Sequence, residues 1–171
     1  MKRLALCIVL AAFAALTVVP AASAKAVSLT RPEKQLLALV NHVRVQHGLP
    51  RVAAVATLER AARAHSREMV RRDYFSHSSF NGQSFMTRLM RFGYSTSGCR
   101  SWSVCEDIAY GWQASGTPQA IFSAWMHSPP HRAVILTKSF RNVGIGRAQG
   151  TFKGISDIVI YTLDCGARTS L

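Results

Sequence analysis

Acidic side chains are scarce in this chain of 171 residues, where 8 Asp and Glu stand against 21 Lys and Arg and the formal net charge is +13 at pH 7. Without Lys2 and Arg3, which belong to a predicted leader, 19 basic residues and a charge of +11 remain. A protein this basic attracts anionic surfaces, so anionic components of the cell envelope are candidate partners.

Aromatic side chains are missing around the most regular group of basic residues. Four arginines recur at helical spacing and would form one basic stripe on a helix face, namely Arg60, Arg63, Arg67 and Arg71. We interpret the stripe as a solvated face, with binding to an anionic polymer as the alternative. Because no aromatic residues alternate with it, base stacking has no platform and we expect no nucleic-acid partner.

Long apolar runs are also missing after the N-terminus, where no segment approaches the roughly 20 apolar residues that span a bilayer. The N-terminus itself has a basic head, an apolar run from Leu4 to Val19 and the small residues Ala22-Ser23-Ala24. This pattern predicts a signal peptide at 1–24, cleaved after Ala24. We therefore expect a secreted, extracellular protein without a transmembrane segment, and a monomer.

Cysteines are few, and their spacing matches no zinc finger. Cys99, Cys105 and Cys165 follow the predicted leader. An oxidising compartment favours one disulfide and one spare thiol. Proximity in the sequence favours a pair between Cys99 and Cys105, while Cys105 with Cys165 is an alternative that would tie the last strand to the segment around Glu106.

Internal repeats and long linkers are absent, so residues after a lead-in at 25–33 are interpreted as one domain. Apolar periodicity and capping signals predict helices after Thr30, over 56–72, near 84–92, after Thr117 and after Pro130. Residues 143–146 and 155–163 are typical of strands, and 98–111 is assigned to a loop or an irregular strand. Helices first and adjacent strands last predict an α+β fold whose antiparallel sheet is covered by helices.

Two consecutive prolines draw attention to His131. Pro129 and Pro130 can end one helix and open the next, which fixes the backbone that carries this imidazole. Glu106 stands in a mostly uncharged neighbourhood, where a carboxylate needs a partner such as a histidine or a metal ion. His77 lies in a serine-rich loop, whereas His65 falls on an apolar helix face and is interpreted as a core histidine.

These residues form a recognisable series. His77 in its loop is followed by Cys105-Glu106-Asp107-Ile108-Ala109, by a tryptophan and the Ser128-Pro129-Pro130-His131-Arg132 segment, and by Asn142-Val143-Gly144-Ile145-Gly146. Over about residues 34–166 the chain resembles the bacterial branch of the CAP superfamily, which comprises cysteine-rich secretory proteins, antigen 5 and pathogenesis-related 1 proteins. Residues 167–171 would form a C-terminal tail.

The resemblance implies a three-layer α-β-α sandwich with a mainly antiparallel sheet. It also implies a ligand-binding cleft formed by His77, Glu106 and His131, which would act as ligands for zinc or another divalent cation. The sequence departs from the family pattern at Cys105, Asp107 and Pro130, and Ser128 takes the place of a second cleft glutamate. One anionic ligand is therefore missing.

The leading hypothesis is a secreted binding module rather than an enzyme, with a lipid or sterol-like small molecule as the first candidate ligand. A zinc-assisted hydrolase of peptide or cell-wall bonds is the alternative from the enzyme class, although no general base is evident once Glu106 acts as a ligand and no H-E-x-x-H motif is present. A basic binder of envelope components is the third hypothesis. No catalytic residue is assigned.

Overall fold

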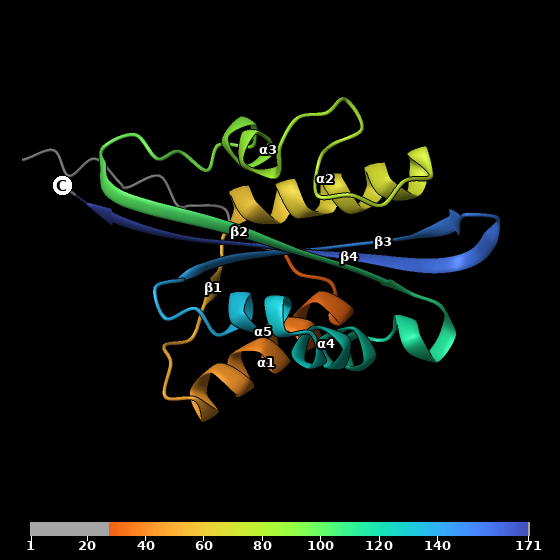
Figure 1. The fold of residues 1–171 in the computed structure, drawn as a ribbon, viewed down its shortest axis with the longest axis horizontal. Coiled ribbons are helices and arrows are strands. Elements are labelled where there is room, and N and C mark those ends of the chain that lie inside the picture. Colours follow the sequence, from red (N-terminus) through yellow and green to blue (C-terminus); the bar gives the residue numbers. More distant parts are fainter. Residues whose placement is uncertain (1–27, 171) are drawn as a thin grey trace, which may run out of the picture.

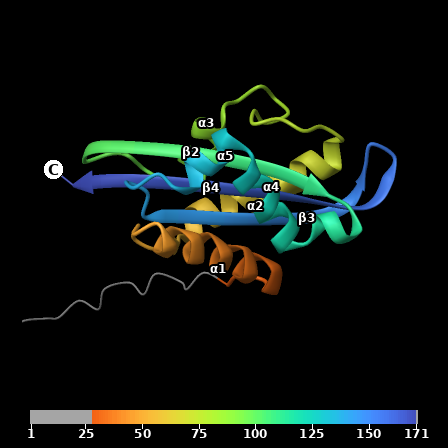
Figure 2. The ribbon, with the colours of Figure 1, turned by 60° about the horizontal axis from the view of Figure 1, so that its bottom comes forward.

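The computed structural model describes residues 28–170, and the predicted signal peptide lies outside them. A four-stranded sheet has helices on both faces, with α2 and α3 on one side and α1, α4 and α5 on the other (Figures 1 and 2). This is the expected three-layer α+β sandwich. The elements in chain order are α1 (Arg31–Gln46), β1 (Ala53–Ala54), α2 (Ala56–Arg72), α3 (Phe85–Arg91), β2 (Cys99–Gly111), the 3-10 helix η1 (Gln113–Gly116), α4 (Pro118–His127), α5 (Pro129–Ile135), β3 (Asn142–Phe152) and β4 (Ile155–Ser170).

The sheet has the strand order β1-β3-β4-β2 and is mixed rather than purely antiparallel. β4 pairs antiparallel with both β2 and β3, whereas the two-residue β1 pairs parallel with β3. The assignment of 98–111 to a loop or irregular strand understated its order, because β2 is a continuous strand of 13 residues. β2 is an edge strand, and β4 continues through residues 167–170.

The helix boundaries follow local signals in the sequence. The backbone amide of Thr30 donates to Glu33 Oε2 at 2.7 Å, as the capping box at the start of α1 predicts. Ser128 ends α4 and precedes α5, and Pro129 is the first residue of α5. The prolines therefore separate the two helices as expected, and they place His131 in the first turn of α5.

Close packing of α2 on the sheet depends on two glycines of β3. A Cβ atom on Gly144 would lie 2.1 Å from the backbone of Leu58, and one on Gly146 would lie 2.1 Å from the backbone of Ala62. Glu59 Oε2 also accepts a hydrogen bond from the amide of Ile145 at 3.0 Å. The N-V-G-I-G segment thus brings α2, and the loop that follows it, against the sheet.

The disulfide joins Cys105 to Cys165, so the pairing that proximity favoured, Cys99 with Cys105, is wrong. Cys105 and Cys165 face each other directly in the antiparallel register of β2 and β4, a short distance that the sequence does not reveal. Cys99 is the free cysteine among residues 28–170. The bridge ties the edge strand to the centre of the sheet immediately beside Glu106.

Candidate functional site

Glu106 receives partners from three separate segments of the chain. Its carboxylate is buried on the α2 side of β2. His77, in the loop after α2, lies with Nδ1 2.9 Å from Glu106 Oε1. Because an ionised carboxylate only accepts hydrogen bonds, the Nδ1–H of His77 is the donor. The predicted pair of His77 and Glu106 therefore meets in the fold.

Arg88 of α3 is a third member of this site that the sequence analysis missed. Its guanidinium forms an ion pair with Glu106 Oε2 and also donates to Ser79 Oγ at 2.8 Å and to the carbonyl of His77 at 3.3 Å. Arg88 is buried, so the charge of Glu106 is compensated by protein rather than by solvent. The sequence led us to expect a histidine or a metal ion as the partner of the Glu106 carboxylate. Its partners are His77 and Arg88.

His65 is a satisfied core histidine, as expected. Its side chain is fully buried, and Nε2 donates to the carbonyl of Ser76 at 2.9 Å. Burial lowers the pKa of His65 to about 4, although the negative charge of Glu106 opposes this shift. A neutral His65 therefore holds the backbone immediately before His77 and is not available to a ligand.

His131 approaches the site from the opposite layer. Its Nδ1 lies 2.7 Å from Ser128 Oγ, a contact within the first turn of α5. Burial lowers the pKa of His131, and the positive charge of His77 lowers it further. Conversely, the hydrogen bond to Glu106 raises the pKa of His77.

Two further carboxylates lie under the site. Asp107 is 1% exposed, one of its oxygens has no partner among the described residues, and burial raises its pKa to about 8. Asp164, which faces Glu106 across the β2–β4 ladder, is fully buried, and burial followed by the charge of Glu106 raises its pKa well above the usual range. Glu106 therefore carries the negative charge that His77 and Arg88 balance.

The predicted set of three metal ligands does not fit this arrangement. Both oxygens of Glu106 are already engaged, and a cation bound to them would lie beside the Arg88 guanidinium. Within residues 28–170 no group of three or more His, Cys, Asp and Glu is arranged to hold a metal ion. What fits better is a pair of imidazoles whose Nδ1 atoms are hydrogen-bonded and whose Nε2 atoms remain for a ligand.

Half of the basic stripe makes contacts within the protein. Arg63 Nε donates to Glu33 Oε1 at 2.9 Å, and its guanidinium also lies 2.7 Å from Glu59 Oε1. Arg60 donates to the carbonyl of Phe92. Arg67 and Arg71 are exposed on the outer surface of α2. Arg60 and Arg63 thus connect α2 to its neighbours, while Arg67 and Arg71 fit the interpretation as a solvated face.

The sequence matches the model of the cysteine-rich secretory protein family, CAP, over residues 37–164. It is 35% identical over 121 residues to the uncharacterized protein YkwD of Bacillus subtilis, a match covering 70% of this chain and 43% of that protein. It is 32% identical over 119 residues to the uncharacterized membrane protein YlbC of the same organism, covering 68% of this chain and 32% of YlbC. The chain thus spans less than half the length of these relatives.

Solved structures agree with this match. An outer surface protein of Borrelia burgdorferi superposes with a TM-score of 0.67 at 20% identity, covering 84% of this chain and 97% of that one. An extracellular SCP-domain protein of Bacillus anthracis superposes with a TM-score of 0.62 at 23% identity, covering 81% and 44%. At such identities the likeness shows the fold alone.

Fold, motif series and sequence match together define a CAP domain. The chain belongs to the cysteine-rich secretory protein family, and bacterial SCP-domain proteins are among its structural neighbours. None of the helices in the described part of the chain is both long and apolar enough to cross a membrane.

Proposed function

We propose that this protein is an extracytoplasmic binding module whose cleft takes a divalent transition-metal ion between His77 and His131. The observation that carries the proposal is that each imidazole has its Nδ1 held by a side chain, Glu106 Oε1 at 2.9 Å and Ser128 Oγ at 2.7 Å. A neutral histidine that donates through Nδ1, as His77 does to Glu106 and as His131 does when Ser128 Oγ accepts, presents a lone pair at Nε2, the form in which imidazole binds metals.

In this proposal Glu106 orients a ligand and is not one itself. A carboxylate behind a metal-binding histidine fixes its tautomer and raises its basicity. Two protein nitrogens leave the coordination of a tetrahedral ion incomplete, so water or a group on a second molecule would supply the remaining positions. The site would therefore present a bound ion to an external ligand.

The lipid or sterol-like ligand stays a proposal drawn from the family resemblance. An apolar cavity beneath α1 and α5, bordered by Val40, Val134 and Leu163, has a volume of only about 10 Å³. A lipid chain does not fit into it, so such a ligand would have to bind on the surface. A secreted location is likewise proposed from the N-terminal pattern at 1–24 and from the extracellular B. anthracis relative.

A hydrolase gains little from the geometry. A metal-assisted mechanism needs a general base for water, and the buried Glu106 carboxylate is occupied by Arg88 and His77. Ser128 and His131 lie at a distance typical of a nucleophile and its base, yet no carboxylate within residues 28–170 forms a hydrogen bond to His131 that would complete a triad. Binding is therefore the function that the site supports best.

Isothermal titration of the protein with Zn²⁺ tests this function. We expect His77→Ala or His131→Ala to remove binding, and Glu106→Gln to weaken it by about 10- to 100-fold, the usual effect of losing an orienting partner. The exposed His42 of α1 provides a matched control, and His42→Ala should bind as the parent does. Undiminished affinity in the His77→Ala/His131→Ala double variant would contradict the proposal.

A further inference from the structure

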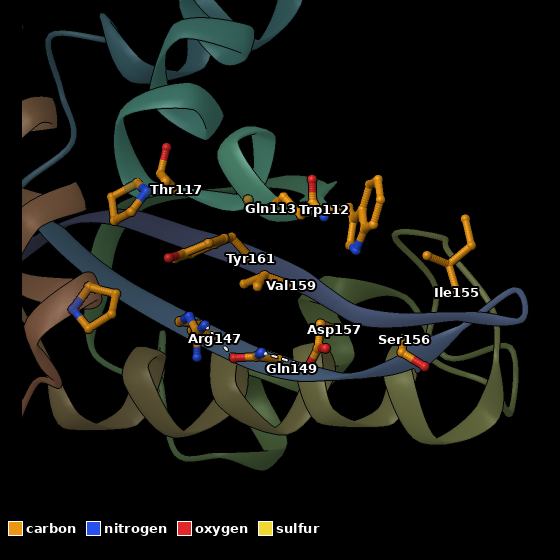
Figure 3. Close-up of a pocket in the computed structure, with 13 residues that line it drawn as sticks. Trp112, Gln113, Thr117, Arg147, Gln149, Ile155, Ser156, Asp157, Val159 and Tyr161 are labelled. Carbon is orange, nitrogen blue, oxygen red and sulfur yellow. Dashed lines mark hydrogen bonds between the residues drawn. The ribbon is translucent and has the colours of Figure 1, made fainter.

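An open cavity lies away from the histidines, beside the turn that connects β3 to β4. It has a volume of about 550 Å³, and its lining includes neither His77, Glu106 nor His131. Figure 3 shows its two walls, with Trp112, Gln113 and Thr117 on one side and side chains of β3 and β4 on the other. We call this cavity the hairpin groove.

The hairpin groove forms where the alternating pattern of β3 changes. Val143 and Ile145 belong to the core between the sheet and α1, and the next two residues on that face are Arg147 and Gln149. The residue that follows Val143 and Ile145 on this face is thus a cation and not an apolar residue. Arg147 lies between the apolar interior and the groove. The change needs a partner for Arg147, because a partly buried guanidinium is costly without one.

The hydrogen bonds of the Arg147 side chain leave part of its guanidinium without a partner. One of its terminal nitrogens donates to Gln149 Oε1 at 2.8 Å, and Gln149 Nε2 in turn donates to Asp157 Oδ1 at 3.2 Å. The Nε atom is buried without a hydrogen-bond acceptor, and no carboxylate of residues 28–170 forms an ion pair with Arg147. Its positive charge is held in place by a neutral amide and is left uncompensated.

Tyr161 provides a second unsatisfied donor at the same end of the groove. Its side chain is 0% exposed, and its hydroxyl meets the guanidinium of Arg147, which is a donor, so the O–H of Tyr161 has no acceptor within the described chain. Burial raises the pKa of Tyr161, while the positive charge of Arg147 opposes the shift, so the two side chains are neighbours. An unsatisfied buried polar group costs about 1–3 kcal/mol, which a ligand acceptor placed here would recover.

One helix adds positive potential at this end. The groove is lined by Thr117 and Pro118 at the start of α4, and by Pro32 in the first turn of α1, where the carboxylate of Glu33 already caps the helix. The N-terminal end of α4 carries partial positive charge and favours an anion nearby. The guanidinium of Arg147, the phenol of Tyr161 and the start of α4 therefore favour one kind of group, a small anion with planar acceptors such as a carboxylate.

The outer end of the groove has a different chemistry. Trp112 is 47% exposed and stands across the groove from Asp157, as Figure 3 shows. An exposed indole offers a flat apolar face to the C–H bonds of a ring. Asp157 has a second carboxylate oxygen that accepts no bond from Gln149, so it is an acceptor for hydroxyl groups. A ligand that has both a ring face and hydroxyl groups therefore matches Trp112 and Asp157.

We propose that the hairpin groove binds an acidic saccharide, with the sugar carboxylate on Arg147 and Tyr161, the ring on Trp112 and hydroxyl groups on Asp157. The site is separate from the metal-binding cleft, so neither proposal depends on the other. An acidic sugar is also the kind of ligand that a strongly basic protein attracts.

Calorimetric titration with two matched sugars tests the assignment. Methyl glucuronide and methyl glucoside differ by a carboxylate in place of a hydroxymethyl group, and we expect the glucuronide to bind at least about tenfold more tightly because the charged pair is present only there. Arg147→Gln should abolish that preference, and Trp112→Ala should weaken both sugars. An apolar acid without hydroxyls, 3-phenylpropionate, should bind more weakly than the glucuronide.

Two substitutions on exposed residues outside the groove serve as controls. Arg67→Gln removes the same charge from the outer surface of α2, and Trp102→Ala removes an indole that is 43% exposed on β2. Both should bind the glucuronide as the parent does. Equal affinity for the two sugars, no binding of the glucuronide, or full binding by Arg147→Gln would overturn the proposal. Equal or tighter binding of 3-phenylpropionate would overturn the saccharide assignment.

Discussion

His77 and His131, the two histidines of the proposed site, are held by different kinds of contact. His77 lies in a loop whose position depends on Glu106 of β2, Arg88 of α3 and His65 of α2. His131 lies in the first turn of α5, and its Nδ1 is hydrogen-bonded to Ser128 Oγ, three residues earlier. One histidine is placed by tertiary structure and the other by local sequence, so damage to the fold should affect them unequally.

The two histidines also differ in charge environment. His77 faces the carboxylate of Glu106, whereas the influences on His131 are burial and the nearby positive charge of His77. The pKa of His77 is therefore raised above that of a free imidazole, and the pKa of His131 is lowered. Both imidazoles of the proposed site must be neutral to bind a metal ion, so the ion would compete with a proton more strongly at His77 than at His131.

Removal of Arg88 should have the largest effect on the difference between His77 and His131. Arg88→Met leaves the buried Glu106 without its cation, and the loss of one member of a buried ion pair destabilises a protein by about 3–5 kcal/mol. We expect the His77 loop to become mobile while His131 keeps its position. Urea unfolding gives the stability, and imidazole NMR signals report the two rings separately.

A double variant separates the charge from the packing of Arg88. In Arg88→Met/Glu106→Gln the uncompensated carboxylate is gone, so the loss of stability should be smaller than in Arg88→Met alone. If the double variant were less stable than Arg88→Met, the ion pair would not be what holds the loop.

The pKa values of the two imidazoles test the same difference, with a smaller expected effect on stability than the removal of Arg88. Glu106 raises the pKa of His77, so its contribution to stability is complete below the ordinary histidine pKa and is lost as pH rises through the folded value. Burial lowers the pKa of His131, so stability falls as pH drops below the ordinary value. Proton NMR titration should place His77 above His131, and Glu106→Gln should lower the pKa of His77. The opposite order would refute the charge assignment.

Sequence motifs predicted the position of His131 better than the contacts of His77. The prolines before His131 determine a helix start through backbone geometry, which the sequence displays directly. The meeting of His77 with Glu106 came from the family resemblance, because 29 residues separate them and spacing carries no such information. Arg88 was missed, since an arginine in a seven-residue helix gives no sign of being buried.

The strand and disulfide errors have a similar physical origin. Residues 99–105 of β2 lie at a sheet edge with both polar and apolar side chains, so the alternation that marks a half-buried strand is weak there. The pairing of Cys105 with Cys165 depends on the register between β2 and β4, which is a property of the assembled sheet. Local sequence patterns predicted the helices and their ends, whereas contacts between strands are determined by the assembled sheet and are visible only in the structure.

Ser128→Ala should give the smallest effect and isolates the local half of the comparison. The substitution removes the hydroxyl that lies 2.7 Å from His131 Nδ1 while the two prolines still define the start of α5. A partly exposed hydrogen bond of this kind contributes about 0.5–1.5 kcal/mol, so stability should change little. Zn²⁺ affinity should fall by a few-fold, less than in Glu106→Gln, because the ring of His131 is still positioned by its helix. Calorimetry on both variants makes the measurement, and an equal or larger loss in Ser128→Ala would mean that His131 depends on its neighbour as strongly as His77 depends on the buried network.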